Sequence, residues 1–204
     1  MQIVLGHVGI FKALVSEARL NAESESQLFE AVQRKAYDEI DLLLDNKVED
    51  SALKQQFKEL IRLSGDESVL ARAQEAFAAA SAAVTAELNE LNDIVHGVKR
   101  RLGELDLHFD LCELRGYEYH TGIVFAAYTN EYGRAVAKGG RYDQLGKAFG
   151  RARPASGFDT DLKVLAQLSE RAFARPRGIL APDSDEPSLC LLYTSDAADE
   201  VLGV

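Results

Sequence analysis

Cysteine is scarce in this sequence of 204 residues, which contains only Cys112 and Cys190. Two cysteines suggest no disulfide framework and fit a reducing compartment. The sequence also lacks an apolar run long enough to cross a bilayer. Its first residues lack the charged and apolar regions of a signal peptide. We therefore expect a cytoplasmic protein that does not insert into a membrane.

Histidines are few, and basic residues are outnumbered by acidic ones. The four histidines, His7, His96, His108 and His120, lack the spacing of a zinc site, so we expect neither a metal nor another cofactor. His7 follows a strand-like run and could reach a ligand, although a histidine in such a turn more often bonds to the backbone. The formal net charge of −10 argues against a general surface for nucleic acids or anionic membranes, but it leaves room for a small basic pocket.

The first half of the chain has the pattern of a strand followed by many helices. Residues 2–5 read as a strand, and apolar residues then recur at helical spacing through residues 10–101. Ser24 opens a capping-box pattern, and Asp50 or Ser51 marks the start of another helix. We therefore expect a block of helices joined by short links.

The pattern then changes to strands. Residues 105–113 alternate between apolar and polar side chains, the period of a half-buried strand. Residues 122–128 and 135–140 read as two strands of a hairpin. Glycines and a proline mark residues 146–157 as an irregular loop, and a last helix is expected over residues 159–173. Helices grouped first and antiparallel strands second predict an α+β fold.

Arginines, aromatic residues and glycines gather in two runs at the ends of strand-like segments, residues 114–125 and 138–143. An arginine can clamp a carboxylate with two parallel hydrogen bonds. Aromatic rings and a carboxylate can frame a flat, nitrogen-bearing side chain, and paired glycines let a ligand approach the backbone. The candidate pocket residues are Arg115, Tyr117, Glu118, Tyr119, His120, Gly139, Gly140, Arg141 and Tyr142.

Packing offers an alternative explanation for the same residues. Tyr117, Tyr119 and Tyr142 would then be aromatic residues of a sheet, which is their commoner role. Arg115 and Arg141 would be structural ion-pair partners. Because these residues occur together, we favour a pocket.

Three segments in order resemble the second half of a class II histidyl-tRNA synthetase core. Arg-Gly-Tyr-Glu-Tyr at residues 115–119 stands where the synthetases have Arg-Gly-Leu-Asp-Tyr-Tyr, and residues 139–143 match their second histidine-specific signature. Residues 153–158 open the third class II motif. Residues 5–11 are similar to a strand-to-helix segment of a non-catalytic family related to these enzymes, the regulatory subunits of ATP phosphoribosyltransferase. The chain resembles that family more closely.

The resemblance implies a class II aminoacyl-tRNA synthetase-like antiparallel sheet with an inserted helical block. Residues 1–182 would form part of this core. The helical block would span residues 10–101, and residues 102–173 would hold the strands and a helix like that of the third motif.

The resemblance also implies that the chain is a fragment, because the first two class II motifs are missing. Residues 183–189 would be a linker. In the last segment, residues 190–204, the run from Cys190 to Glu200 is similar to the translation of a transposase adapter used in sequencing libraries. An ordinary acidic tail is the alternative.

In the resembled family the first two signatures line a histidine pocket. By that resemblance Arg115 would hold the ligand carboxylate. Glu118, Tyr119 and His120 would bond to the imidazole or stack on it, and Tyr142 would form a wall.

Two departures favour the regulatory subunits over the synthetases. Synthetases end the third motif with Gly-Leu-Glu-Arg, and that arginine contacts the ATP phosphates. Here Asp161 and Val164 take the first and last of these positions, and neither can bind a phosphate. Lys163 would point elsewhere on a helix. His120 replaces the second tyrosine of the first signature.

The resemblance therefore implies a non-catalytic, allosteric regulatory subunit that acts in the first step of histidine biosynthesis. Its partner would be the short catalytic subunit of ATP phosphoribosyltransferase, its effector L-histidine, and no tRNA would bind. An active histidyl-tRNA synthetase and an orphan histidine-binding module remain the alternatives.

Overall fold

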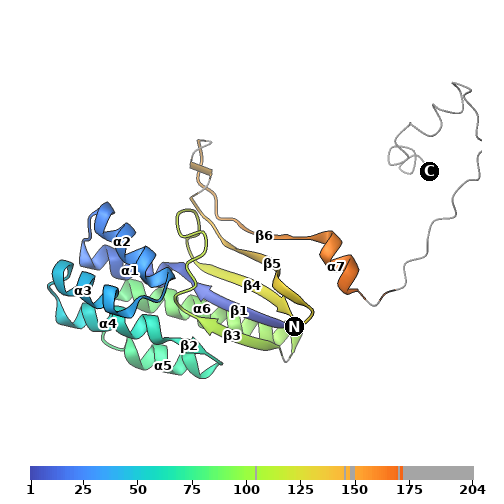
Figure 1. Cartoon of the computed structure of the whole chain (residues 1–204), viewed down its shortest axis with the longest axis horizontal. Coiled ribbons are helices and arrows are strands. Elements are labelled where there is room, and N and C mark those ends of the chain that lie inside the picture. Colours follow the sequence, from blue (N-terminus) through green and yellow to red (C-terminus); the bar gives the residue numbers. More distant parts are fainter. Residues whose placement is uncertain (104, 145, 148–149, 170, 172–204) are drawn as a thin grey trace, which may run out of the picture. The chain divides into compact units, whose positions relative to one another are not determined.

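The computed structural model describes residues 1–169 and 171, except residues 104, 145 and 148–149 (Figure 1). The chain divides into two units, Met1–Ser169 and Glu170–Val204. The elements described below all belong to the first unit. The expected linker and adapter-like tail lie outside the described residues.

A six-stranded sheet with the order β2-β3-β1-β4-β5-β6 forms the centre of the first unit. β1 pairs with β3 in parallel, and the remaining neighbours are antiparallel. The α+β class is confirmed, but the sheet is mixed rather than wholly antiparallel. The strands are β1 (Gln2–His7), β2 (Ser64–Gly65), β3 (Asp106–Asp110), β4 (Ile123–Thr129), β5 (Tyr132–Arg141) and β6 (Ser156–Thr160).

Six helices separate β1 from β3, and a seventh follows β6 (Figure 1). The expected helical block is therefore confirmed, since it is inserted in the sequence between two neighbouring strands of the sheet. None of the described helices has both the length and the apolar character to cross a membrane. The helices are α1 (Val8–Ala18), α2 (Ala22–Gln33), α3 (Tyr37–Lys47), α4 (Ser51–Arg62), α5 (Ser68–Ala76), α6 (Ala82–Leu102) and α7 (Leu162–Leu168).

Side chains cap the starts of four helices, α2, α4, α6 and α7. Asp50 caps α4, because its Oδ1 accepts hydrogen bonds from the backbone N–H groups of Ala52 and Leu53. The predicted start of α2 at Ser24 is wrong. Asn21 caps this helix instead, with Oδ1 accepting from the Ser24 N–H at 2.8 Å. Asparagine is as strong a cap as serine, so the earlier residue takes the role.

β6 overlaps the end of the predicted irregular loop, residues 146–157, and the start of the predicted last helix, residues 159–173. Its pairing with β5 places Phe158 opposite Gly139 and Gly157 opposite Gly140. The segment has little alternation of apolar and polar residues, so the pairing comes from contact with β5 rather than from local preference. As a result, the last helix begins at Leu162 rather than near residue 159. Residues 172–173 of the expected helix lie outside the described residues.

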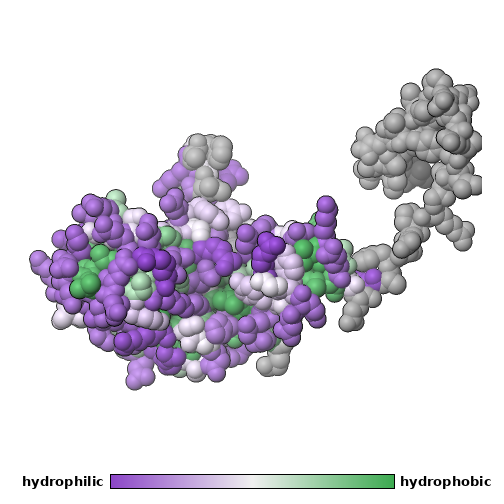
Figure 2. Space-filling view, in the orientation of Figure 1, coloured by the Kyte–Doolittle hydropathy of each residue, from purple (hydrophilic) through white to green (hydrophobic). Residues whose placement is uncertain are grey.

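α7 packs on the sheet through few residues. Val164 is buried in a small apolar cluster with Ala127 and Val136, against which Leu168 also packs. Leu162, by contrast, is 74% exposed. Figure 2 shows apolar surface at this end of the unit, whereas the helical block presents mainly hydrophilic residues in the same view.

The main core lies where β1 leads into α1. Phe11 is fully buried and makes edge-to-face contacts with Phe57 and Tyr117, with ring centroids 5.9 and 5.5 Å apart. Tyr117 belongs to the first signature, so this aromatic cluster joins the core to the segment that carries the candidate pocket residues.

Replacing Phe11 with alanine should lower the free energy of unfolding by about 3–5 kcal/mol, because the change removes buried apolar contacts and leaves a cavity. Leu42→Ala is the control, since Leu42 is 65% exposed and should cost no more than about 0.5 kcal/mol. Urea denaturation followed by circular dichroism measures both. Equal losses in the two variants would contradict this description of the core.

Candidate functional site

A hollow of about 300 Å³ lies beside β4, β5 and β6 and the turn that precedes β4. Five of the nine predicted site residues line it. This volume is at the lower end of the range for small-molecule sites. The five residues are Arg115, Tyr119, His120, Gly139 and Tyr142.

A tight turn brings the residues of the first signature into the hollow. Gly116 has a φ of +67°, a left-handed conformation that favours glycine. The backbone N–H of His120 donates to the Gly116 carbonyl at 2.8 Å, which folds the chain back on itself. A Cβ at Gly116 would lie 2.6 Å from His120 Nδ1, so the turn also needs the absent side chain.

The His120 ring is held on several sides. Its Nδ1 donates to the Arg115 carbonyl at 2.8 Å, and because a carbonyl only accepts, the proton lies on Nδ1. Tyr119 and Tyr142 lie beside the ring, with centroids 4.3 and 6.4 Å away. The Nζ of Lys12 donates to the His120 carbonyl at 2.6 Å. His120 is therefore an oriented aromatic wall of the hollow, and it is only 5% exposed.

Arg115 is oriented but still open to solvent. Its Nη2 lies 3.3 Å from Glu113 Oε2, and its backbone N–H donates to Glu113 Oε1 at 3.1 Å. A hydrogen bond with the Tyr128 hydroxyl, and to a lesser extent the charge of Glu113, raises the pKa of Arg115. The side chain remains 42% exposed. The guanidinium has five N–H donors, so it can bind a further carboxylate while these contacts hold it.

Charged residues that the sequence analysis did not select complete the lining. Glu113, Lys138 and Asp159 all border the hollow, and Lys138 Nζ lies 3.8 Å from Asp159 Oδ2. Glu113 stands only two residues before Arg115, so the sequence alone could have identified it as a neighbour of the site. Asp159 could not be found without predicting β6. With Arg115, the hollow has two positive and two negative side chains, an arrangement that suits a zwitterion.

The paired glycines of the second signature have protein atoms beside them. A Cβ at Gly139 would lie 2.2 Å from the Gly157 carbonyl oxygen. A Cβ at Gly140 would lie 2.9 Å from the His120 ring. Both glycines therefore allow close packing between protein segments, because protein atoms occupy the space that a Cβ would need, although Gly139 still borders the hollow.

Tyr117 and Glu118 lie apart from the other predicted residues and line a second hollow. The Tyr117 ring stacks on Phe29 at 4.8 Å, and its hydroxyl donates to Glu25 at 2.5 Å. Burial, followed by the hydrogen bond to Glu25, raises the pKa of Tyr117. These contacts anchor the turn on α2. Tyr117 therefore fits the packing alternative better than a role in the candidate pocket.

Arg141 also has a structural environment. Its Nε donates to Asp143 Oδ1 at 2.6 Å, and its carbonyl accepts from the Thr121 N–H at 2.8 Å. Arg141 and Gly140 are not among the described residues that border the candidate pocket. Thr121 ties the turn before β4 to the end of β5, because its hydroxyl also donates to Asp143 Oδ2 at 3.2 Å.

The third motif ends in an anionic helix cap. Asp161 Oδ1 accepts hydrogen bonds from the backbone N–H groups of Lys163 and Val164, at 2.9 and 3.2 Å. Val164 is buried. A carboxylate therefore already occupies the N–H groups at the start of α7, and it would repel a phosphate there.

Sequence comparisons identify related proteins of about twice this length. A family model described as histidyl-tRNA synthetase matches residues 1–165. An ATP phosphoribosyltransferase regulatory subunit from Chromohalobacter salexigens is 50% identical over 189 residues, covering 93% of this chain and 48% of that protein. The corresponding protein from Thioalkalivibrio sulfidiphilus is 47% identical, covering 91% and 47%. The chain spans about half the length of the curated relatives it matches.

Solved structures share the fold. An ATP phosphoribosyltransferase regulatory subunit/histidyl-tRNA synthetase from Bacillus halodurans C aligns with a TM-score of 0.69 at 24% identity, covering 83% of this chain and 44% of that chain. The ATP phosphoribosyl transferase (HisG:HisZ) complex from Thermotoga maritima aligns with a TM-score of 0.53 at 19% identity, covering 71% and 49%. These similarities confirm the fold expected from the class II signatures.

Replacing Gly116 with alanine should destabilise the turn that forms the pocket. The left-handed φ and the contact with His120 together should cost about 1–3 kcal/mol of unfolding free energy. Gly133→Ala is the matched control, because a Cβ at Gly133 meets no atom within 4 Å and should change stability by less than about 0.5 kcal/mol. Urea titrations of both variants test this, and a neutral Gly116→Ala would show that the turn does not need its glycine.

Proposed function

Since the chain belongs to the histidyl-tRNA synthetase family, we propose that it forms part of the non-catalytic regulatory subunit of ATP phosphoribosyltransferase. The observation that carries this proposal is the 50% identity, over 93% of this chain, to a protein of that name. The protein would act in the cytoplasm in the first step of histidine biosynthesis. It would require no cofactor, metal or tRNA for that role.

The third motif supports the non-catalytic assignment. A synthetase needs positive charge near the phosphates of ATP, where it stabilises the reacting centre. Here Asp161 places a carboxylate on the N–H groups at the start of α7, and Val164 is a buried apolar residue. Both features weaken phosphate binding at this end of the sheet.

The charges and rings of the pocket support L-histidine as the effector. Arg115 offers N–H donors for a carboxylate, and Glu113 or Asp159 could accept from an ammonium group. Tyr119, His120 and Tyr142 supply flat surfaces for an imidazole. The hollow therefore contains a complementary group for each part of a histidine zwitterion.

We further propose that the partner is a short catalytic subunit of ATP phosphoribosyltransferase. The similarity of fold to a chain of a HisG:HisZ complex supports such an assembly. Histidine would regulate the complex if it bound one assembly state more tightly than another, since a ligand shifts an equilibrium only through differential affinity.

An active histidyl-tRNA synthetase is the second candidate, because the matching family model carries that description. Such an enzyme would catalyse exchange between ATP and pyrophosphate in the presence of histidine. A regulatory subunit would not, because its pocket would hold histidine without activating it.

Arg115→Ala should weaken L-histidine binding by about 10- to 100-fold, since a charged hydrogen-bonding group contributes about 1.5–3 kcal/mol. Isothermal calorimetry on the 204-residue chain measures the affinity. Arg134→Ala is the matched control, because Arg134 lies over the Tyr132 ring and does not border the pocket. Its affinity should match that of the parent chain. Unchanged affinity in Arg115→Ala would remove Arg115 from the site.

The regulatory role is tested with the whole protein that carries this segment. Mixed with a short catalytic subunit, it should raise ATP phosphoribosyltransferase activity well above that of the catalytic subunit alone, and L-histidine should reverse the increase. Alone, it should show no histidine-dependent exchange between ATP and pyrophosphate. Robust exchange would instead establish the synthetase. If the protein neither activates the catalytic subunit nor catalyses exchange, but calorimetry shows that it binds histidine, it is a histidine-binding module.

A further inference from the structure

A buried histidine lies outside the pocket, where β1 ends and α1 begins. The side chain of His7 is 0% exposed. Neither ring nitrogen has a hydrogen-bond partner within the described part of the chain. Burial lowers the pKa of His7 to about 4, so the ring is neutral near pH 7. A buried, unpaired polar ring costs folding free energy, and this cost requires an explanation.

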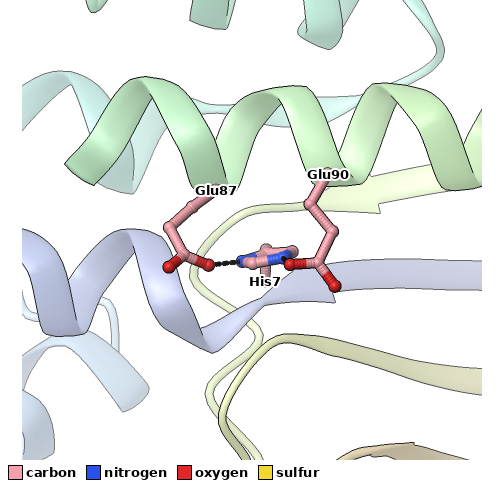
Figure 3. Close-up of side chains that lie close together, drawn as sticks. All are labelled: His7, Glu87 and Glu90. Carbon is pink, nitrogen blue, oxygen red and sulfur yellow. Dashed lines mark ion pairs between the residues drawn. The ribbon is translucent and has the colours of Figure 1, made fainter. Parts of the chain in front are cut away.

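Two carboxylates flank this ring. Glu87 and Glu90 extend from α6 toward His7, one on each side (Figure 3). Glu87 Oε2 lies 3.5 Å from His7 Nδ1, and Glu90 Oε2 lies 4.0 Å from Nε2. Their spacing of three residues places both on one face of the helix. Burial, and then the charge of Glu90, raises the pKa of Glu87. The cluster thus places two carboxylates beside a neutral imidazole.

The backbone beside the cluster leaves room for this approach. A Cβ at Gly9 would lie 2.1 Å from Glu87 Oε2 and 3.1 Å from the Cε1 of His7. Any larger residue at this position would displace the carboxylate from the ring. Gly9 therefore permits the close approach of the imidazole and the Glu87 carboxylate.

We propose that His7, Glu87 and Glu90 form a binding site for a first-row divalent transition-metal ion, represented here by Zn²⁺. One ligand atom from each residue lies within 4.8 Å of the other two. Ligands of one zinc ion, each at about 2.0–2.2 Å from it, lie up to about 4 Å apart. Because Glu87 lies against Nδ1 and Glu90 against Nε2, one carboxylate must rotate toward the nitrogen that binds the ion, and both glutamate side chains are partly exposed, at 30% and 47%.

The donor set determines the class of ion. A neutral imidazole nitrogen is a good ligand for zinc, copper, iron and nickel, whereas magnesium prefers oxygen ligands and retained waters. Two carboxylates neutralise the charge of a divalent ion. The exposure of Glu90 leaves a path for a water molecule to complete the coordination.

The spacing among the four histidines predicted no metal site. This site uses one histidine and two glutamates that lie about 80 residues later in the chain. The ion would fasten the start of α1 to α6. The inference does not depend on the proposed regulatory function.

Zinc binding to the chelator-treated 204-residue chain tests the proposal. Calorimetry should show one Zn²⁺ per chain, and bound zinc should raise the melting temperature. Glu87→Gln and Glu90→Gln should each weaken the affinity at least about tenfold, since even groups that only orient metal ligands contribute 10- to 100-fold. Asp93→Asn is the matched control, because it removes an exposed carboxylate from the same helix. Its affinity should equal that of the parent chain.

Three results would overturn the site. These are no saturable zinc binding by the parent chain, equal affinities in Glu90→Gln and Asp93→Asn, and magnesium binding as tight as that of zinc. Glu90 is largely exposed, so Glu90→Gln is expected to fold, and circular dichroism checks this. His7→Gln removes the third ligand and should also weaken binding. Its melting curve without metal separates a folding defect from the loss of a ligand.

Discussion

β1 pairs with β3 in parallel and with β4 in antiparallel register, and this double pairing determines how the rest of the chain is arranged. A parallel pair cannot be joined by a tight turn, so the chain must leave the sheet and return at its starting end. Helices α1 to α6 form that crossover, with only the short strand β2 added to the sheet on the way. The helical block is therefore a long connection between two neighbouring strands, and its apolar faces supply most of the core.

The candidate pocket depends on the same pairing. The Val8 N–H at the start of α1 donates to the Gly122 carbonyl at 3.0 Å, and Lys12 in the same helix donates to the His120 carbonyl. Tyr117 packs between Phe11 and Phe29. The turn that carries Arg115 is thus attached to α1 and α2 before it enters β4. The core therefore fixes the positions of the pocket walls.

Local patterns in the sequence were enough to predict most elements of the fold. The spacing of Leu53, Phe57 and Leu60 identified α4, and all three are buried. The alternation in residues 105–113 identified β3. The parallel register of β1 with β3 could not be predicted in this way, because it joins segments about 100 residues apart. β6 was missed for a similar reason, since its strand conformation comes from pairing with β5.

In the candidate site, distance in the sequence does not decide which residues are neighbours. A tight turn separates residues that are close in the sequence, and the register of the sheet joins residues that are far apart. Tyr117 and Tyr119 are two residues apart, yet the turn at Gly116 directs them to different hollows. Lys138 and Asp159 are far apart in the sequence, yet the register of β5 and β6 makes them direct neighbours. A signature therefore predicts where a pocket lies more reliably than which of its residues line it. The charge pattern that suits a zwitterion arises only once β6 has added its carboxylate beside the lysine of β5.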